Sequence, residues 1–205
     1  LDKNLPPAPE LEADAEPEAT EFVETTPDMQ LETLVAKLKD DASNETLRFD
    51  LVKLLLQLGR DDDAKIAFAP VIAQTSTVRK FASLKRWMDA IDSIAIKAIN
   101  TPATGENGTQ IDFDARIAAN KRDFEARFGK AQSLMAQQRW TEAMDELLEI
   151  LMRDKTWNED QARKTYIAIL DIIEPAPVKV ADGHIPPVDA TVATYRRRLS
   201  SVVLS

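Results

Sequence analysis

Few residues of this sequence have the types and spacing that chemistry requires. The single histidine, His184, has Asp182 nearby but no second histidine, cysteine or acid at ligand spacing, so we expect an exposed loop histidine rather than a catalyst or metal ligand. Three acids at 61–63 suggest a cation site, but we favour acids in the first turn of a helix that interact favourably with the helix dipole. Three arginines at 196–198 suggest anion binding, but we favour solvated residues that counter a helix C-terminus or acidic neighbours.

No arrangement of residues predicts an enzyme. The sequence shows no paired carboxylates at a recognisable catalytic spacing, no nucleophile with a base and no phosphate-binding loop. The chain has no cysteine, which excludes a disulfide, a thiolate nucleophile and a sulfur metal site. We therefore expect no catalytic activity, no cofactor and no metal.

The charge is concentrated at the start of the chain. The net charge is −9, and residues 1–30 hold nine acids against one lysine, so the remainder is nearly neutral. A nearly neutral folded part does not favour nucleic acid, whose phosphates need a concentrated basic surface. No apolar run is long enough to span a bilayer, and no signal peptide is visible, so we expect no membrane partner.

A pair of helices is predicted over residues 124–157. Apolar side chains recur at helical spacing in both halves, and the break falls at 138–141, where Thr141 is the expected N-cap. The apolar stripes are Phe128, Ala131, Leu134 and Met135, then Ala143, Leu147, Ile150 and Leu151. This helix-turn-helix of about 34 residues resembles a tetratricopeptide repeat.

A second copy of this pattern lies at 45–72. Aligned without gaps, the matching pairs include Arg48 with Arg127, Phe49 with Phe128, and Arg60 with Arg139. The second turn departs from the pattern, because Gln138 replaces the usual glycine. Pro70 interrupts a helix of the first copy, and we expect a bend there because proline lacks an amide donor.

The other helical patterns complete an all-α fold, a solenoid of about nine helices in antiparallel pairs. We expect helices at 28–39 capped by Thr26, from residues 75–77 as caps to about 99, at 111–119, at 158–173 with Asn158 and Gln161 as a capping box, and at 188–204. Loops are predicted at 100–110 and 174–187. The repeats fall near 45–74, 77–120 and 124–157, with terminal helices at 158–204, all within a domain at 28–205.

Residues 1–27 are predicted to be the end of a preceding domain followed by an acidic, disordered linker. The segment is rich in proline, glutamate and alanine, a composition that buries too little surface to offset the entropy of ordering. Because the chain begins at Leu1, we expect a fragment of a longer protein.

Two surfaces are candidates for partner binding. The resemblance implies that the first helix of each pair lines a concave face, which here would carry Phe49, Lys53, Leu56, Phe128, Gln132 and Met135. Aromatic and methionine side chains suit promiscuous apolar recognition, but the same residues equally fit a buried core. The last helix offers Tyr195, Leu199, Val202, Val203 and Leu204, which either seal the solenoid, the interpretation we favour, or dock a partner.

Segments 153–164 and 195–201 are similar to the C-terminal end of bacterial thioredoxin-linked co-chaperones, the chaperedoxins, and residues 1–6 resemble the end of a thioredoxin. The resemblance implies a cytoplasmic protein that holds unfolded or partly folded clients and passes them to the major chaperones. The family's redox motif lies in a thioredoxin-like domain that this sequence does not contain, so no redox residue is transferred. The segment 175–187 is longer than the family's turn, and its role stays open.

The alternative hypothesis is an adaptor that scaffolds one defined partner without holding unfolded proteins. Binding of several unrelated unfolded proteins would distinguish the two hypotheses. The sequence gives neither the identity of the partner nor the oligomeric state.

Overall fold

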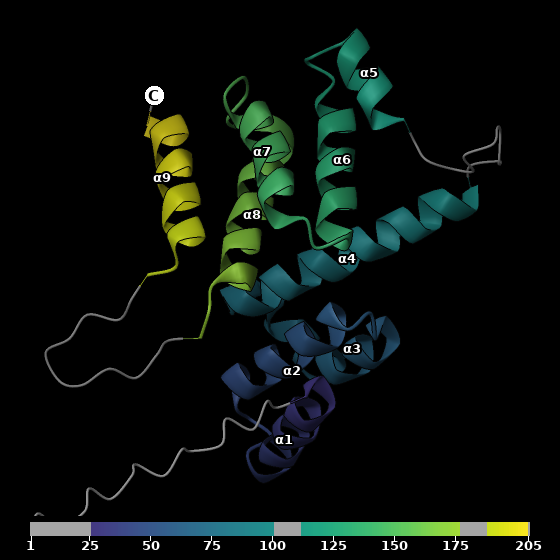
Figure 1. The fold of residues 1–205 in the computed structure, drawn as a ribbon, viewed down its shortest axis with the longest axis vertical. Helices are drawn as coiled ribbons and strands as arrows, with labels where there is room; N and C mark the ends of the chain where they lie inside the picture. Colours follow the sequence, from purple (N-terminus) through teal and green to yellow (C-terminus); the bar gives the residue numbers. More distant parts are fainter. Residues whose placement is uncertain (1–25, 101–111, 177–187, 205) are drawn as a thin grey trace, which may run out of the picture.

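The computed structural model describes residues 26–100, 112–176 and 188–204 (Figure 1). These residues form nine α-helices and one 3₁₀ helix, η1, and contain no strand, which confirms the all-α prediction. The bounds are α1 Pro27–Asp40, α2 Glu45–Gln57, α3 Asp61–Phe68, η1 Ala69–Ser76, α4 Arg79–Asn100, α5 Phe113–Ala119, α6 Phe124–Ala136, α7 Trp140–Leu151, α8 Trp157–Ile173 and α9 Ala190–Leu204. The predicted linker up to residue 25, most of both predicted loops and His184 lie outside the described residues.

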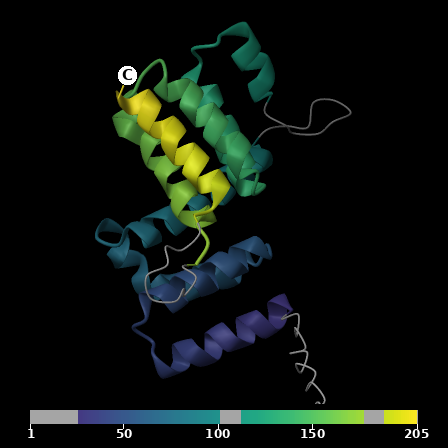
Figure 2. The same ribbon diagram turned by 60° about the vertical axis from the view of Figure 1, so that its left-hand side comes forward.

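The longest helix, α4, lies between two groups of helices. Figures 1 and 2 show α1 to α3, in purple and blue, on one side of it and α6 to α9, in green and yellow, on the other. Helix α4 packs against α2 and η1 of the first group and against α6 and α8 of the second. Its Phe81, Leu84 and Trp87 are fully buried, so one hydrophobic core runs through both groups.

The two sequence copies share a backbone geometry at their turns. Gly59 and Gln138 occupy the aligned position, and both have left-handed backbones, with φ of 69° and 60°. The following amide donates to a carbonyl of the preceding helix in both copies, over 2.9 Å from Arg60 and 2.8 Å from Arg139. Gln138 therefore takes up the conformation that glycine adopts more easily, and the alignment of the two copies is confirmed at this point.

An arginine on the first helix of each copy braces the pair. The Arg48 guanidinium donates to the carbonyl of Ala42, before α2, over 3.0 Å and to that of Ala67 on α3 over 2.9 Å. Arg127 repeats both contacts, donating to a carbonyl before α6 over 3.1 Å and to the Glu146 carboxylate on α7 over 2.7 Å. The aligned arginines thus join the helices of each pair at aligned positions, through a backbone carbonyl in the first copy and a carboxylate in the second.

The predicted bend at Pro70 is confirmed, because α3 ends at Phe68 and the chain continues as the 3₁₀ helix η1. The predicted caps at 75–77 are wrong. The hydroxyls of Thr75, Ser76 and Thr77 donate to carbonyls three residues earlier, and Val78, which lacks a side-chain acceptor, precedes α4. Local hydrogen bonding within η1 therefore competes with capping for these hydroxyls.

Thr141 is not the N-cap of α7. The helix begins at Trp140, so Arg139 holds the cap position without a side-chain cap bond, and Thr141 is the exposed second residue of the helix. Arg139 instead forms an ion pair with Glu142, three residues later. The aligned Arg60 pairs with Asp63 at 2.7 Å in the same way.

The predicted capping box of α8 is also wrong. Asn158, Glu159 and Asp160 form a left-handed turn, with φ of 47°, 55° and 64°, whereas an N-cap residue needs an extended backbone. The Gln161 amide oxygen accepts from the Arg86 guanidinium of α4 over 2.7 Å. A contact between distant helices has thus taken the side chain that the local pattern assigned to capping.

The sequence predicted that the helix at 111–119 pairs with the helix that precedes it. Within the described residues, α5 packs against α6, and no comparable packing joins α5 to α4. A Cβ atom added at Gly129 of α6 would lie 2.5 Å from Phe113 Cε1 of α5, closer than real contacts allow. The missing side chain of Gly129 is therefore what lets α5 approach α6.

Replacing Gly129 by alanine should displace α5. Helix α5 has no buried residue, so we expect the clash to cost only about 1 kcal/mol in the free energy of unfolding, the low end of overpacking costs. The better helix propensity of alanine inside α6 offsets about the same amount, so the net change should be small. The effect is measured by urea unfolding of Gly129→Ala, of Phe113→Ala and of the double variant. The effects should not add, because Phe113→Ala removes the ring with which the new methyl group collides; the double variant should be more stable than the sum predicts, and full additivity would contradict this account.

Candidate interaction site

Three of the predicted groove residues belong to the core. Phe49, Leu56 and Met135 are 4%, 2% and 0% exposed. Side chains buried to this degree cannot contact a partner unless the helices move apart. The structure therefore favours, for these three residues, the alternative in which their apolar character serves packing.

Phe128 and Gln132 are half-buried on α6. The Phe128 ring lies 5.3 Å from the ring of Trp157 at the start of α8, and Phe124 lies 6.4 Å from the same indole. The Phe128 ring is therefore engaged in an aromatic cluster between α6 and α8. It does not form an open apolar surface for promiscuous binding.

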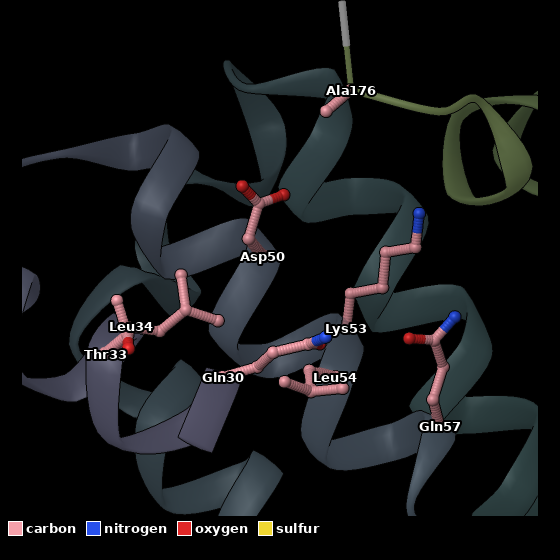
Figure 3. Close-up of a pocket in the computed structure, with 8 residues that line it drawn as sticks. All are labelled: Gln30, Thr33, Leu34, Asp50, Lys53, Leu54, Gln57 and Ala176. Carbon is pink, nitrogen blue, oxygen red and sulfur yellow. The ribbon is translucent and has the colours of Figure 1, made fainter. Parts of the chain in front are cut away.

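Lys53 lies in a different setting, a cleft between α1 and α2 with a volume of about 390 Å³ (Figure 3). One wall carries Thr33 and Leu34 of α1, and the other carries Lys53 and Leu54 of α2. Ala176, just after the end of α8, reaches one end of the cleft. We call this feature the α1–α2 cleft.

The α1–α2 cleft holds two half-buried charges. Asp50 and Lys53 lie one turn apart on α2 and extend from it in the same direction (Figure 3). Among the described residues, neither charge has a hydrogen bond or an ion pair. Burial raises the pKa of the Asp50 carboxyl, against the opposing effect of Lys53 and Lys80. Burial likewise lowers the pKa of the Lys53 ammonium, against the opposing effect of Asp50.

Partial burial without a direct partner has a consequence for binding. Both groups have already lost part of their water, so an incoming group of opposite charge finds them partly desolvated and fixed on a helix. The arrangement can therefore bind charged side chains and discriminate between them. Sequence analysis selected Lys53 but missed Asp50, although a spacing of three residues on a helix places both on one face.

The last helix is held in place by a polar cluster. The Tyr166 hydroxyl of α8 donates to the Tyr195 carbonyl over 2.8 Å, and the Tyr195 hydroxyl donates to the Asp145 carboxylate of α7 over 3.2 Å. The Arg198 guanidinium donates to the same carboxylate over 2.6 Å and lies 4.8 Å from the Tyr195 ring centre. Burial is the main factor that raises the pKa of the Tyr195 hydroxyl. These contacts join α9 to α7 and α8.

The remaining residues of α9 mostly face the same neighbours. Leu199 and Val202 pack against the core, and Val203 is half-buried, whereas Leu204 is 86% exposed. This placement agrees with α9 sealing the end of the array, apart from its last residue.

The interpretation of the three arginines at 196–198 is confirmed at two of them. Arg196 pairs with Glu174 at 2.8 Å, and Arg198 pairs with Asp145 at 2.6 Å. The acids at 61–63 form the first turn of α3, as predicted. Within the described ranges, no three histidines, cysteines or acids gather closely enough to hold a metal ion.

Comparison with known families identifies the second group of helices. A tetratricopeptide repeat family model matches residues 104–203, which include α5 to α8 and all of α9 except its last residue. Residues 104–203 are therefore similar to tetratricopeptide repeats. The match leaves out α2 and α3, whose relation to α6 and α7 rests on the aligned turns and arginines described above. Tetratricopeptide repeats are protein-protein interaction modules and are typically not catalytic.

A comparison with curated proteins found no match. In the ranges that the structure describes, every helix is too short or too polar to cross a bilayer.

Removing the charges of the α1–α2 cleft should stabilise the fold at neutral pH. A carboxyl whose pKa is raised in the folded state lowers the stability of the protein as the pH rises through that pKa. Asp50→Asn should therefore increase the free energy of unfolding at pH 7, and this increase should disappear in acid. Lys53 has a lowered pKa in the folded state, so its charged form reduces the free energy of unfolding at pH 7, and this reduction fades as the pH rises toward 10.5. Lys53→Met should therefore increase the free energy of unfolding at pH 7, and this increase should disappear in alkali.

Each gain should stay below about 1 kcal/mol, because solvent screens both half-exposed groups. Urea unfolding at several pH values measures it. Asp62→Asn is the matched control: it removes an exposed acid from the first turn of α3 and should lower stability slightly, through the helix dipole. A loss of stability at pH 7 in Asp50→Asn would contradict a carboxylate whose burial costs more than its charged neighbours return.

Proposed function

We propose that this protein is an adaptor that binds a segment of one defined partner protein in the α1–α2 cleft. The observation that carries the proposal is the pair of half-buried charges, Asp50 and Lys53, that lack a direct partner among the described residues. Elsewhere the fold pairs its buried charges: Asp171 accepts from Arg79 over 2.9 Å and from Ser83 over 3.0 Å. Half-buried charges that compensate each other only at a distance cost stability and are suited to a ligand that pairs with them directly.

The co-chaperone implied by the resemblance is the second candidate. Burial of Phe49, Leu56 and Met135 speaks against a promiscuous apolar groove in the first helix of each pair. What favours this candidate is the exposed apolar side chain of Leu204 at the end of α9. In this form of the proposal α9 contacts unfolding clients in the bacterial cytoplasm, and the protein passes them to the major chaperones.

Photo-crosslinking tests the adaptor. A photoreactive benzoylphenylalanine at Gln57, in the cleft, should capture one defined protein from extract of the source cells. The same residue at Gln137, exposed just after α6, is the matched control and should not. The captured protein, once purified, should bind the full chain at a fixed stoichiometry by calorimetry, and Asp50→Asn with Lys53→Met should weaken that binding. Crosslinks to many proteins from both positions would contradict the adaptor.

Suppression of aggregation tests the co-chaperone. Two unrelated, chemically denatured reporter proteins are diluted into buffer with the chain, with Leu204→Glu and with Ser201→Glu. The two variants place the same charge on α9, but only the first removes an exposed large apolar side chain. If the protein is a co-chaperone, the unchanged chain should protect both reporters from aggregation. Leu204→Glu should reduce this protection, and Ser201→Glu should leave it unchanged. The adaptor predicts protection of neither reporter.

A further inference from the structure

We infer that the α1–α2 cleft selects an extended polypeptide segment with two opposite charges separated by one residue, the basic side chain facing Asp50 and the acidic side chain facing Lys53. The inference rests on the proposed adaptor function and specifies the chemistry of the segment that the adaptor binds.

The spacing of the two charges fits an extended chain. Asp50 and Lys53 are three residues apart on α2, which separates them by about 4.5 Å along the helix axis. In an extended segment, side chains on the same face are two residues apart, or about 6.8 Å. The long, flexible stem of Lys53 spans the difference. Adjacent residues of an extended chain point to opposite faces and could not contact both groups.

The length of the cleft fits a segment of about this size. Its wall on α2 runs from Asp50 to Gln57, about 10 Å along the helix axis. Three residues of an extended chain cover the same distance. The residue between the two charges points away from α2, toward the wall that carries Leu34 of α1, so an apolar side chain fits there.

The environment of the two charges requires both signs in the ligand. A neutral segment would remove more water from Asp50 and Lys53 without replacing it, and a segment with one charge would compensate only one of them. Lys80 is exposed nearby and lies 5.1 Å from the Phe49 ring centre, which leaves Lys53 as the ammonium that lines the cleft. Recognition by paired opposite charges gives selectivity by order as well as by sign.

Peptides that differ in charge order test the inference. Three end-blocked, eleven-residue peptides in a glycine-serine context carry Arg-Leu-Glu, Glu-Leu-Arg or Gln-Leu-Gln at the centre. The first two have the same composition and net charge, so only local pairing distinguishes them. Each is titrated into the ¹⁵N-labelled full chain. One charged order should bind about tenfold more tightly than both the other order and the neutral peptide, with shifts on α1 and α2.

Exchanging the two protein charges provides the matched variant. Asp50→Lys combined with Lys53→Asp keeps the net charge and both side-chain positions, and it should reverse the preferred order of the peptide. Circular dichroism and urea unfolding verify that the variant is folded. An equal affinity for all three peptides, no binding of any of them, or an order preference that the exchange leaves unchanged would overturn the inference.

The adaptor function and the inference fail in different ways. If the partner captured at Gln57 binds the exchanged variant as tightly as the unchanged chain, the adaptor stands and the charge-pair rule is wrong. If no partner is captured at Gln57 while one charged peptide order is preferred and the charge exchange reverses that preference, the adaptor is wrong and the cleft still has the inferred selectivity.

Discussion

The buried face of α4 is the constraint on which the rest of the structure depends. Trp87 is fully buried there, 4.8 Å from the ring of Trp140 in an edge-to-face arrangement, and Phe81 packs edge-on against Phe68 of α3 at 6.1 Å. Aromatic side chains of this size bury enough area to hold two helix groups together. Among the described residues, the Trp87 indole nitrogen has no hydrogen-bond partner. Because α2 packs on α4, this face also fixes one wall of the α1–α2 cleft.

Charges in this fold fall into two kinds. Asp171 and Arg127 are 5% and 7% exposed, and both are compensated, by Arg79 and Ser83 in the first case and by Glu146 at 2.7 Å in the second. These groups join helices, and breaking such a pair leaves an uncompensated buried charge. Asp50 and Lys53 form the second kind, since their partial burial is not matched by a direct partner in the described residues. The difference separates charges that serve the fold from charges available to a ligand.

Sequence reasoning recovered the features that are local or repeated. Helical periodicity located every helix of the described residues except η1, and alignment of the two copies placed Gln138 in the position of Gly59. It failed where contacts between residues far apart in the sequence determine the structure. Gln161 bonds Arg86 rather than capping α8, and α5 packs on α6 through Gly129. Periodicity also identifies an apolar face without saying whether a second layer of helices covers it, which is why the core residue Leu56 was a candidate for binding. The cleft depends on α1, which lies outside both copies.

The central claim is that α4 makes one cooperative body of the two helix groups and thereby holds the cleft in shape. Native-state hydrogen exchange in increasing urea tests it directly, with amides of α2 reporting on the first group and amides of α7 on the second. A single body predicts that the most protected amides of both helices become exchangeable together, with the same free energy and the same dependence on urea. Earlier exchange of α2, at a urea concentration where α7 stays protected, would contradict the claim.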